Sequence, residues 1–195
     1  MKRFFATGTT GLALAVTACG GGGDAGGEAP APAPAPAPAA APSAAPSSAD
    51  WIVVDEDAGT VTIDLIAGET DANNRWNFNG YVSGEATVVV PEGFEVTINF
   101  ENLDPVNMHS VGVLEPMGSY PAMFENPTPV FDGAITSNAT SMTEATAPGG
   151  GSETITFTAG SAGEYALVCL IPAHATSGMY IGFEVSASGE SGLRM

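Results

Sequence analysis

The sequence predicts an all-β domain, an antiparallel sandwich or barrel, over residues 51–195. Three observations predict this fold. From Trp51 onward, short runs either alternate apolar with polar residues or are rich in β-branched and aromatic ones. Stretches rich in glycine and proline separate these runs, and no segment repeats its apolar residues with a sustained helical period. About 145 residues are enough for one domain with its own hydrophobic core.

Six runs are the expected strands. Residues 60–65 (TVTIDL) and 94–100 (FEVTINF) alternate strictly, as a strand does when only one of its faces is buried. Four further runs are rich in β-branched or aromatic residues: 110–114, 154–158, 165–169 and 179–185. Turn-forming residues at 91–93, 148–151 and 160–163 separate the strands, which is typical of a sandwich.

Residues 115–147 interrupt this pattern. The segment is rich in proline, lacks periodicity and is too long for a simple hairpin connection. We interpret it as an insertion that is either functional or particular to a family.

The first 18 residues have the features of an export signal. Lys2 and Arg3 precede an apolar run over 11–16, which is too short to remain as a membrane-spanning helix. The sequence Val-Thr-Ala-Cys at 16–19 resembles the lipobox of bacterial lipoproteins, which predicts that Cys19 is lipidated and becomes the mature N-terminus. We therefore expect an exported protein, anchored to the cell membrane or outer membrane, with its domain in the periplasm or extracellular space. The alternative is an ordinary secretory signal followed by an unrelated cysteine.

Residues 19–50 are expected to be a disordered linker. They contain mostly glycine, alanine and proline, with too few bulky apolar residues to offset the entropy of ordering. The Ala-Pro alternation over 29–38 favours polyproline conformation, so the Pro-bearing stretch forms a semi-rigid stalk on the order of 50 Å long. The predicted organisation is a signal (1–18), a lipidated linker (19–50) and one domain (51–195).

The charge of the chain excludes some partners. Four basic residues stand against 22 acidic ones, a formal net charge of -18. Loss of residues 1–18 leaves Arg75 and Arg194 against 22 acids, a formal charge of -20. Binding of nucleic acid or of an anionic membrane surface is therefore not expected. Because the acids are scattered, the charge indicates either solubility in a saline or acidic medium or a basic docking partner.

The stretch CLIPAHATSGM places Cys169, His174 and Met179 five positions apart. Cys169 ends a predicted strand, Pro172 opens a loop, and Met179 begins the next strand. One strand-loop-strand unit could thus direct a thiolate, an imidazole and a thioether at a single point. If Cys19 is lipidated, Cys169 also has no partner for an intramolecular disulfide.

The second of the two histidines, His109, opens another predicted strand. Together with the three residues above, it completes the ligand set of a mononuclear blue-copper centre. In such a centre a trigonal thiolate and imidazole set with a weak axial thioether accommodates both copper oxidation states. Each residue alone is more often an ordinary packing or surface residue, so the prediction rests on the four together.

Residues 51–185 resemble the cupredoxins, and the sulfocyanin and rusticyanin branch in particular. The resemblance rests on Cys-x4-His-x4-Met, on NFNGY at 77–81 and on the Met-His-Ser step at 108–110. It implies a Greek-key sandwich that holds one type 1 copper through His109, Cys169, His174 and Met179. Ser110 after the first histidine implies a fairly high redox potential, and both Ser110 and Asn102 are expected to lie close to the ligands.

The leading functional hypothesis is a membrane-anchored one-electron carrier. Electrons would pass through an exposed edge of His174, which the apolar residues at 170–175 surround. The resemblance implies redox partners in a respiratory chain: a donor complex or cytochrome, and a terminal oxidase as acceptor. The main alternative is copper storage or delivery.

An enzyme is not expected. With both histidines engaged, none remains for a second copper centre. A Cys169–His174 nucleophile pair would leave Met179 and His109 without a role.

Overall fold

The computed structural model describes residues 44–195. The predicted export signal, Cys19 and most of the predicted linker lie outside the described residues. Within residues 44–195, no helix has the length and apolar character needed to cross a membrane.

The described part of the chain forms nine strands and one short 3-10 helix. Their bounds are β1 Ile52–Asp55, β2 Thr60–Ala67, η1 Ala72–Arg75, β3 Thr87–Pro91, β4 Glu95–Asn102, β5 Gly112–Leu114, β6 Gly151–Thr158, β7 Gly163–Val168, β8 Tyr180–Ser186 and β9 Gly192–Arg194. All six predicted strand regions contain a strand, although the run at 110–114 pairs only from Gly112 onward. β1, β3 and β9 were not predicted from the sequence.

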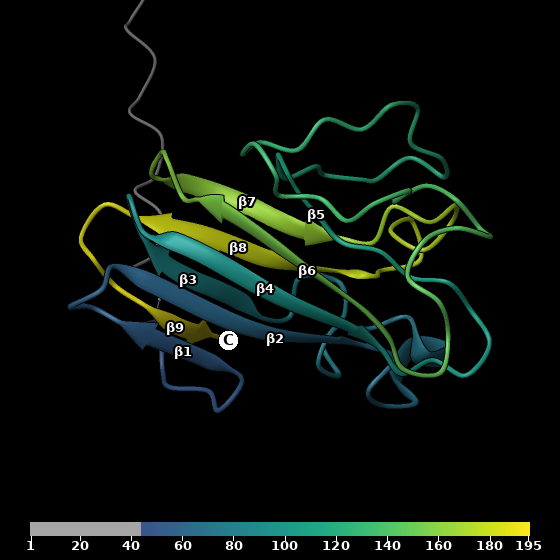
Figure 1. Ribbon diagram of the computed structural model, residues 1–195, viewed down its shortest axis with the longest axis horizontal. Helices are drawn as coiled ribbons and strands as arrows, with labels where there is room; N and C mark the ends of the chain where they lie inside the picture. The colour runs from purple at the N-terminus through teal and green to yellow at the C-terminus, as the bar shows by residue number, and fades with distance from the viewer. Residues whose placement is uncertain (1–43) are drawn as a thin grey trace, which may run out of the picture. The chain divides into compact units, whose positions relative to one another are not determined.

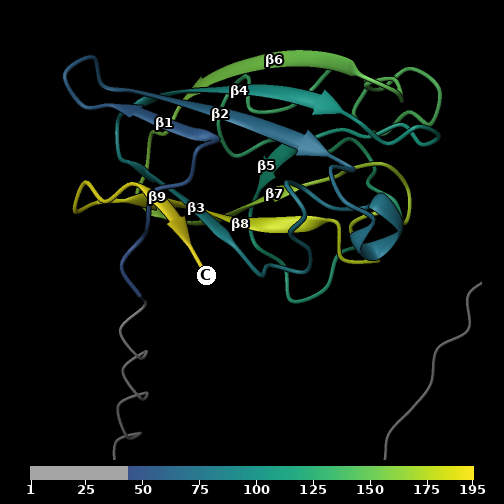
Figure 2. The same cartoon turned by 90° about the horizontal axis from the view of Figure 1, so that it is seen from below.

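The strands form two sheets, which pack face to face as the two layers in Figure 2. One sheet has the order β1-β2-β4-β6 and the other the order β5-β7-β8-β3-β9. Burial alternates along β4, where Val96, Ile98 and Phe100 point into the core between the sheets. The sequence pattern of 94–100 thus gives the strand one buried and one exposed face. The predicted all-β sandwich is confirmed.

The sheets are mixed, whereas the sequence pattern predicted antiparallel ones. β2 pairs with β4 in parallel, and β3 pairs with β8 in parallel. Between β2 and β4 the chain crosses to the other sheet, forms β3 and returns. A hairpin cannot join two parallel neighbours, and this crossover is the connection that β2 and β4 require. Alternation within each strand carries no information about this connection.

Residues 115–147 form loops and turns with no named strand, yet they are part of the core. The ring of Phe131 is buried and stacks on Phe157 of β6, with ring centroids 5.6 Å apart. Thr146 exchanges two backbone hydrogen bonds with His109, with N···O distances of 3.3 and 3.1 Å. The insertion therefore packs on the β-sandwich and reaches one of the predicted ligands.

The last residues of the predicted linker contact the domain. Ser47 exchanges two backbone hydrogen bonds of 2.7 Å with Leu193 of β9. The Arg194 side chain donates to the Ala44 carbonyl at 2.6 Å and pairs with Glu184. Ala44 and Ser47 thus contact the domain.

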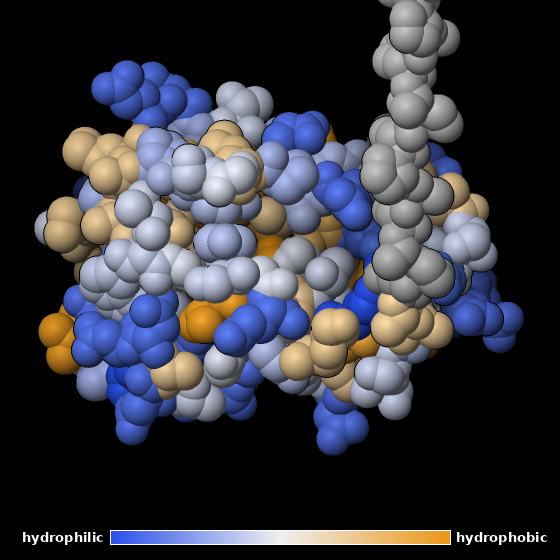
Figure 3. All heavy atoms as spheres, turned by 180° about the vertical axis from the view of Figure 1, so that it is seen from behind, coloured by the Kyte–Doolittle hydropathy of each residue, from blue (hydrophilic) through white to orange (hydrophobic). Residues whose placement is uncertain are grey.

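Hydrophilic side chains are spread over the face shown in Figure 3, with small separate hydrophobic areas between them. This distribution agrees with the scattered acidic residues of the sequence.

Candidate metal centre

The predicted ligand loop is a compact unit between β7 and β8, at the end of the sandwich where η1 also lies (Figure 1). Cys169 directly follows β7 and Met179 directly precedes β8. The Cys169 amide donates to the Met179 carbonyl at 3.1 Å, and the Met179 amide donates to the His174 carbonyl at 2.9 Å. These bonds fix the three predicted ligands relative to one another through the backbone.

Gly178 is required at the turn that closes this loop. Its φ of +96° lies in the left-handed region, which disfavours other residues. A Cβ atom at this position would meet Ser83 Oγ, and the Ser83 amide donates to the Gly178 carbonyl at 2.7 Å. The segment around Ser83 therefore packs directly on the ligand loop.

Three donor atoms converge at the site. Cys169 Sγ lies 3.8 Å from His109 Nδ1 and 3.5 Å from His174 Nδ1, and the two Nδ1 atoms are 3.1 Å apart. A point equidistant from the three atoms lies about 2 Å from each, close to the ~2.0–2.3 Å bonds that a transition-metal ion such as zinc makes to nitrogen and sulfur. The three side chains therefore fit one shared metal ion.

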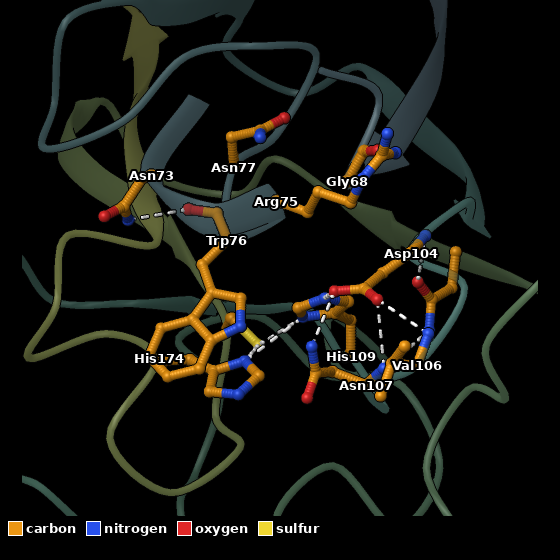
Figure 4. A network of polar contacts seen from close by, with 12 residues as sticks. Gly68, Asn73, Arg75, Trp76, Asn77, Asp104, Val106, Asn107, His109 and His174 are labelled. Carbon is orange, nitrogen blue, oxygen red and sulfur yellow. Dashed lines mark hydrogen bonds and ion pairs between the residues drawn. The ribbon is translucent and has the colours of Figure 1, made fainter. Parts of the chain in front are cut away.

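All four predicted ligands are buried. Cys169, His109 and Met179 have no exposed surface, and His174 is 4% exposed. The expectation of an exposed His174 edge is therefore wrong. The indole of Trp76 covers the imidazole, with the two ring centroids 4.0 Å apart and the planes at 21° (Figure 4).

Asp104 orients His109. Its Oδ2 lies 3.1 Å from His109 Nε2, so the carboxylate accepts the Nε2 proton and the Nδ1 lone pair faces Cys169 and His174. The backbone amides of Val106 and Asn107 donate to Asp104 Oδ1 at 2.8 and 3.0 Å. Burial by itself raises the pKa of Asp104, but the hydrogen bonds from Asn107, Val106 and His109 together lower it to about 2. Asp104 is therefore an ionised acceptor at neutral pH.

Burial also sets the protonation of the three donors. It raises the pKa of the Cys169 thiol to about 11, against opposing hydrogen bonds from Ile171 and Ser110. Burial lowers the pKa of His174 to about 4, and the nearby His109 lowers it by a smaller amount. Burial also lowers the pKa of His109, although its hydrogen bond and charge interaction with Asp104 act in the opposite direction. The imidazoles are thus neutral, as metal ligands must be, and a bound metal would displace the thiol proton.

The two supporting residues of the sequence analysis lie at different distances from the donors. Ser110 Oγ lies 3.9 Å from Cys169 Sγ and accepts from the Leu170 amide at 3.0 Å. Asn102 is one step further away: its Nδ2 donates to the Thr146 carbonyl at 3.0 Å, and Thr146 pairs with His109. Ser110 contacts a predicted ligand, and Asn102 fixes the backbone that carries another.

The family model for the sulfocyanin (SoxE) domain matches residues 47–191. The chain belongs to the sulfocyanin family. A curated sulfocyanin of Sulfolobus acidocaldarius is 31% identical over 125 residues, which cover 62% of this chain and 61% of that protein. The aligned segment thus spans less than two thirds of the relative. The predicted resemblance to the cupredoxins of this branch is confirmed.

The solved structures to which the chain is similar include a rusticyanin and an auracyanin. Rusticyanin from Thiobacillus ferrooxidans has a TM-score of 0.47 and 25% identity, covering 70% of this chain and 87% of that one. Reduced auracyanin from Roseiflexus castenholzii has a TM-score of 0.44 and 26% identity, covering 64% and 96% respectively. The family assignment itself rests on the sulfocyanin model.

Sulfocyanins are electron-transfer cupredoxins, and the cofactor of this chain is one type 1 copper. The donor set fits it, because a buried thiol and two imidazoles whose free nitrogens face one point favour copper over the hard, oxygen-preferring cations. This confirms the expected cofactor.

Asp104 and Trp76 were not predicted from the sequence. Asp104 stands in Asp-Pro-Val-Asn, where an acid that bonds to the following amides is an ordinary turn signal. That signal explains its local bonds but not its contact with His109. Trp76 follows a run of polar residues and carries no signal of its own.

Proposed function

We propose that His109, Cys169, His174 and Met179 hold the copper, and that the protein carries single electrons between redox partners. The observation that carries the proposal is the convergence of the Cys169 sulfur and the two histidine Nδ1 atoms in a buried site. When bound there, copper supplies a one-electron couple between its cuprous and cupric states.

The chain's own residues keep the donors in place in both states. Asp104 fixes the orientation of the His109 ring, and the loop's backbone bonds fix Cys169, His174 and Met179. Because these groups are buried and held by hydrogen bonds within the protein, the donors need little rearrangement when the charge of the site changes. Low rearrangement suits electron carriage better than release of the metal to another protein.

The ligand assignment predicts a visible spectrum. Addition of cupric ion to the purified protein should give an intense absorption from thiolate-to-copper charge transfer. Cys169→Ser should abolish the band because the sulfur is its origin, and Met179→Leu should keep it in altered form because the thioether is the weak ligand. Met117→Leu, at a half-exposed methionine outside the site, is the matched control and should leave the band unchanged. A colourless protein, or a band that survives in Cys169→Ser, would refute the assignment.

Whether the copper stays bound to the protein distinguishes electron transfer from copper delivery. The reduced, copper-loaded protein should reduce a terminal oxidase while its own copper content stays constant. Loss of copper at each encounter would support delivery instead.

We further propose that the protein is exported, lipidated at Cys19 and anchored to the cell membrane or outer membrane, where it serves a respiratory chain. The lipobox-like residues 16–19 and the long proline-rich linker support this placement. Expressed in a bacterial host, the protein should sediment with membranes and incorporate labelled fatty acid. Cys19→Ala should abolish the label, and the Cys169→Ser control should retain it. Equal labelling of Cys19→Ala would contradict the anchor.

A further inference from the structure

Trp76 separates His174 from solvent. Its indole is half-buried and stacks on the imidazole, while His174 itself is almost entirely buried. Figure 4 shows the indole lying over the imidazole of His174. A partner that approaches His174 from this side meets the indole first.

The backbone that presents Trp76 is strained. The three preceding residues, Asn73, Asn74 and Arg75, have φ values of +49°, +58° and +66°. Asparagine tolerates the left-handed region, but arginine adopts it only at an energetic cost. Among residues 44–195 the buried Trp76 Nε1 atom has no hydrogen-bond partner. Strain that persists in a folded protein indicates a position held for function.

Hydrogen bonds hold this strained segment against the ligand loop. Asn73 Nδ2 donates to the Ser177 carbonyl of the ligand loop at 2.8 Å and to the Trp76 carbonyl at 3.0 Å. Arg75 donates to the Gly68 carbonyl at 3.0 Å, and the buried Asn77 side chain ties the segment to two further carbonyls upstream. The stack of Trp76 on His174 is therefore a fixed part of the site.

We propose that electrons enter and leave the protein through the indole of Trp76, which couples a docked partner to His174. The inference rests on the proposed electron-carrier function. In one transfer the reduced protein loses one electron and a one-electron acceptor, such as a haem or copper centre of the partner, gains it. Trp76 is neither oxidised nor deprotonated, and no bond forms or breaks.

The test compares the copper-loaded protein with Trp76→Leu and Trp76→Phe. Electron self-exchange between oxidised and reduced copies is measured by NMR line broadening, at high salt to screen the repulsion between acidic copies. Trp76→Leu should slow self-exchange by about tenfold or more. Trp76→Phe keeps an aromatic ring, so its self-exchange rate should fall much less. The reduction potential and visible band should stay as in the parent, because the four ligands are unchanged.

Trp51 supplies the matched control, because it is the only other tryptophan and is also half-buried. Trp51→Leu should exchange electrons at the parent rate. In a separate measurement on the initially metal-free protein, cupric ion should quench tryptophan fluorescence more strongly in Trp51→Phe, which retains Trp76, than in Trp76→Phe. This measurement still tests the proposal if Trp76→Leu does not fold.

Three outcomes would overturn the proposal. One is a Trp76→Leu protein that exchanges electrons as fast as the parent. Another is slower exchange together with a shifted potential or band, which would make Trp76 a structural support. The third is equal quenching in the two phenylalanine variants. A parent protein without the visible band or without self-exchange would instead count against the proposed function itself.

Discussion

Asp104→Asn should weaken copper binding by about 10–100-fold. An asparagine oxygen in place of Oδ1 still accepts from the amides of Val106 and Asn107. The amide group in place of Oδ2 would face the His109 Nε2 proton with protons of its own. The imidazole then has to turn or move its proton to Nδ1, and either change removes the lone pair that faces the site.

A competition titration against a chelator of known copper affinity measures the loss. Asp64→Asn is the matched control, because it also removes one negative charge but at an exposed carboxylate that accepts from Asn99. The control should bind copper like the parent protein. Equal affinities for Asp104→Asn and Asp64→Asn would show that Asp104 does not orient the ligand.

Phe183→Ala should lower the free energy of unfolding by about 3–5 kcal/mol. Phe183 lies in β8 with no exposed surface, and its ring makes edge contacts with Phe131 and Phe157 at centroid distances of 6.5 and 6.0 Å. Its removal leaves a cavity between the two sheets. The strands around it are anchored on both sides by backbone pairing, so they have little freedom to collapse into the space.

Urea unfolding of the metal-free protein measures this loss, because bound copper would add its own binding energy to the folded state. Val53→Ala is the control: Val53 is 59% exposed, and its truncation should change stability by no more than ~0.5 kcal/mol. A Phe183→Ala protein as stable as Val53→Ala would mean that the two sheets repack freely around the site of the missing ring.

Local sequence predicted the part of the site that is local in the chain. Cys169 and His174 share one strand-loop-strand unit, so their spacing indicates that they converge, and their donor atoms lie 3.5 Å apart. Met179 as the fourth ligand stays a prediction. His109 could be added because only two histidines exist in the chain. Trp76 and Asp104 could not be predicted, since each acts on a ligand through the packing of a separate loop.

The same distinction applies to the fold. Strictly alternating runs predicted β2 and β4, because the apolar residues of each run form the buried face of the strand. β3 was missed because its run TVVVP is buried almost throughout and has no alternation to detect. The parallel pairing of β2 with β4 depends on a crossover between sheets, which no single strand encodes.

The pairing of Thr146 with His109 limits how this scaffold can be shortened. Deletion of residues 115–147 would remove Thr146, whose backbone hydrogen bonds hold His109 in place. It would also remove Phe131, whose ring stacks on Phe157 in the core. A shortened version of the protein would therefore need other residues to hold the His109 backbone and to fill the space that the Phe131 ring occupies.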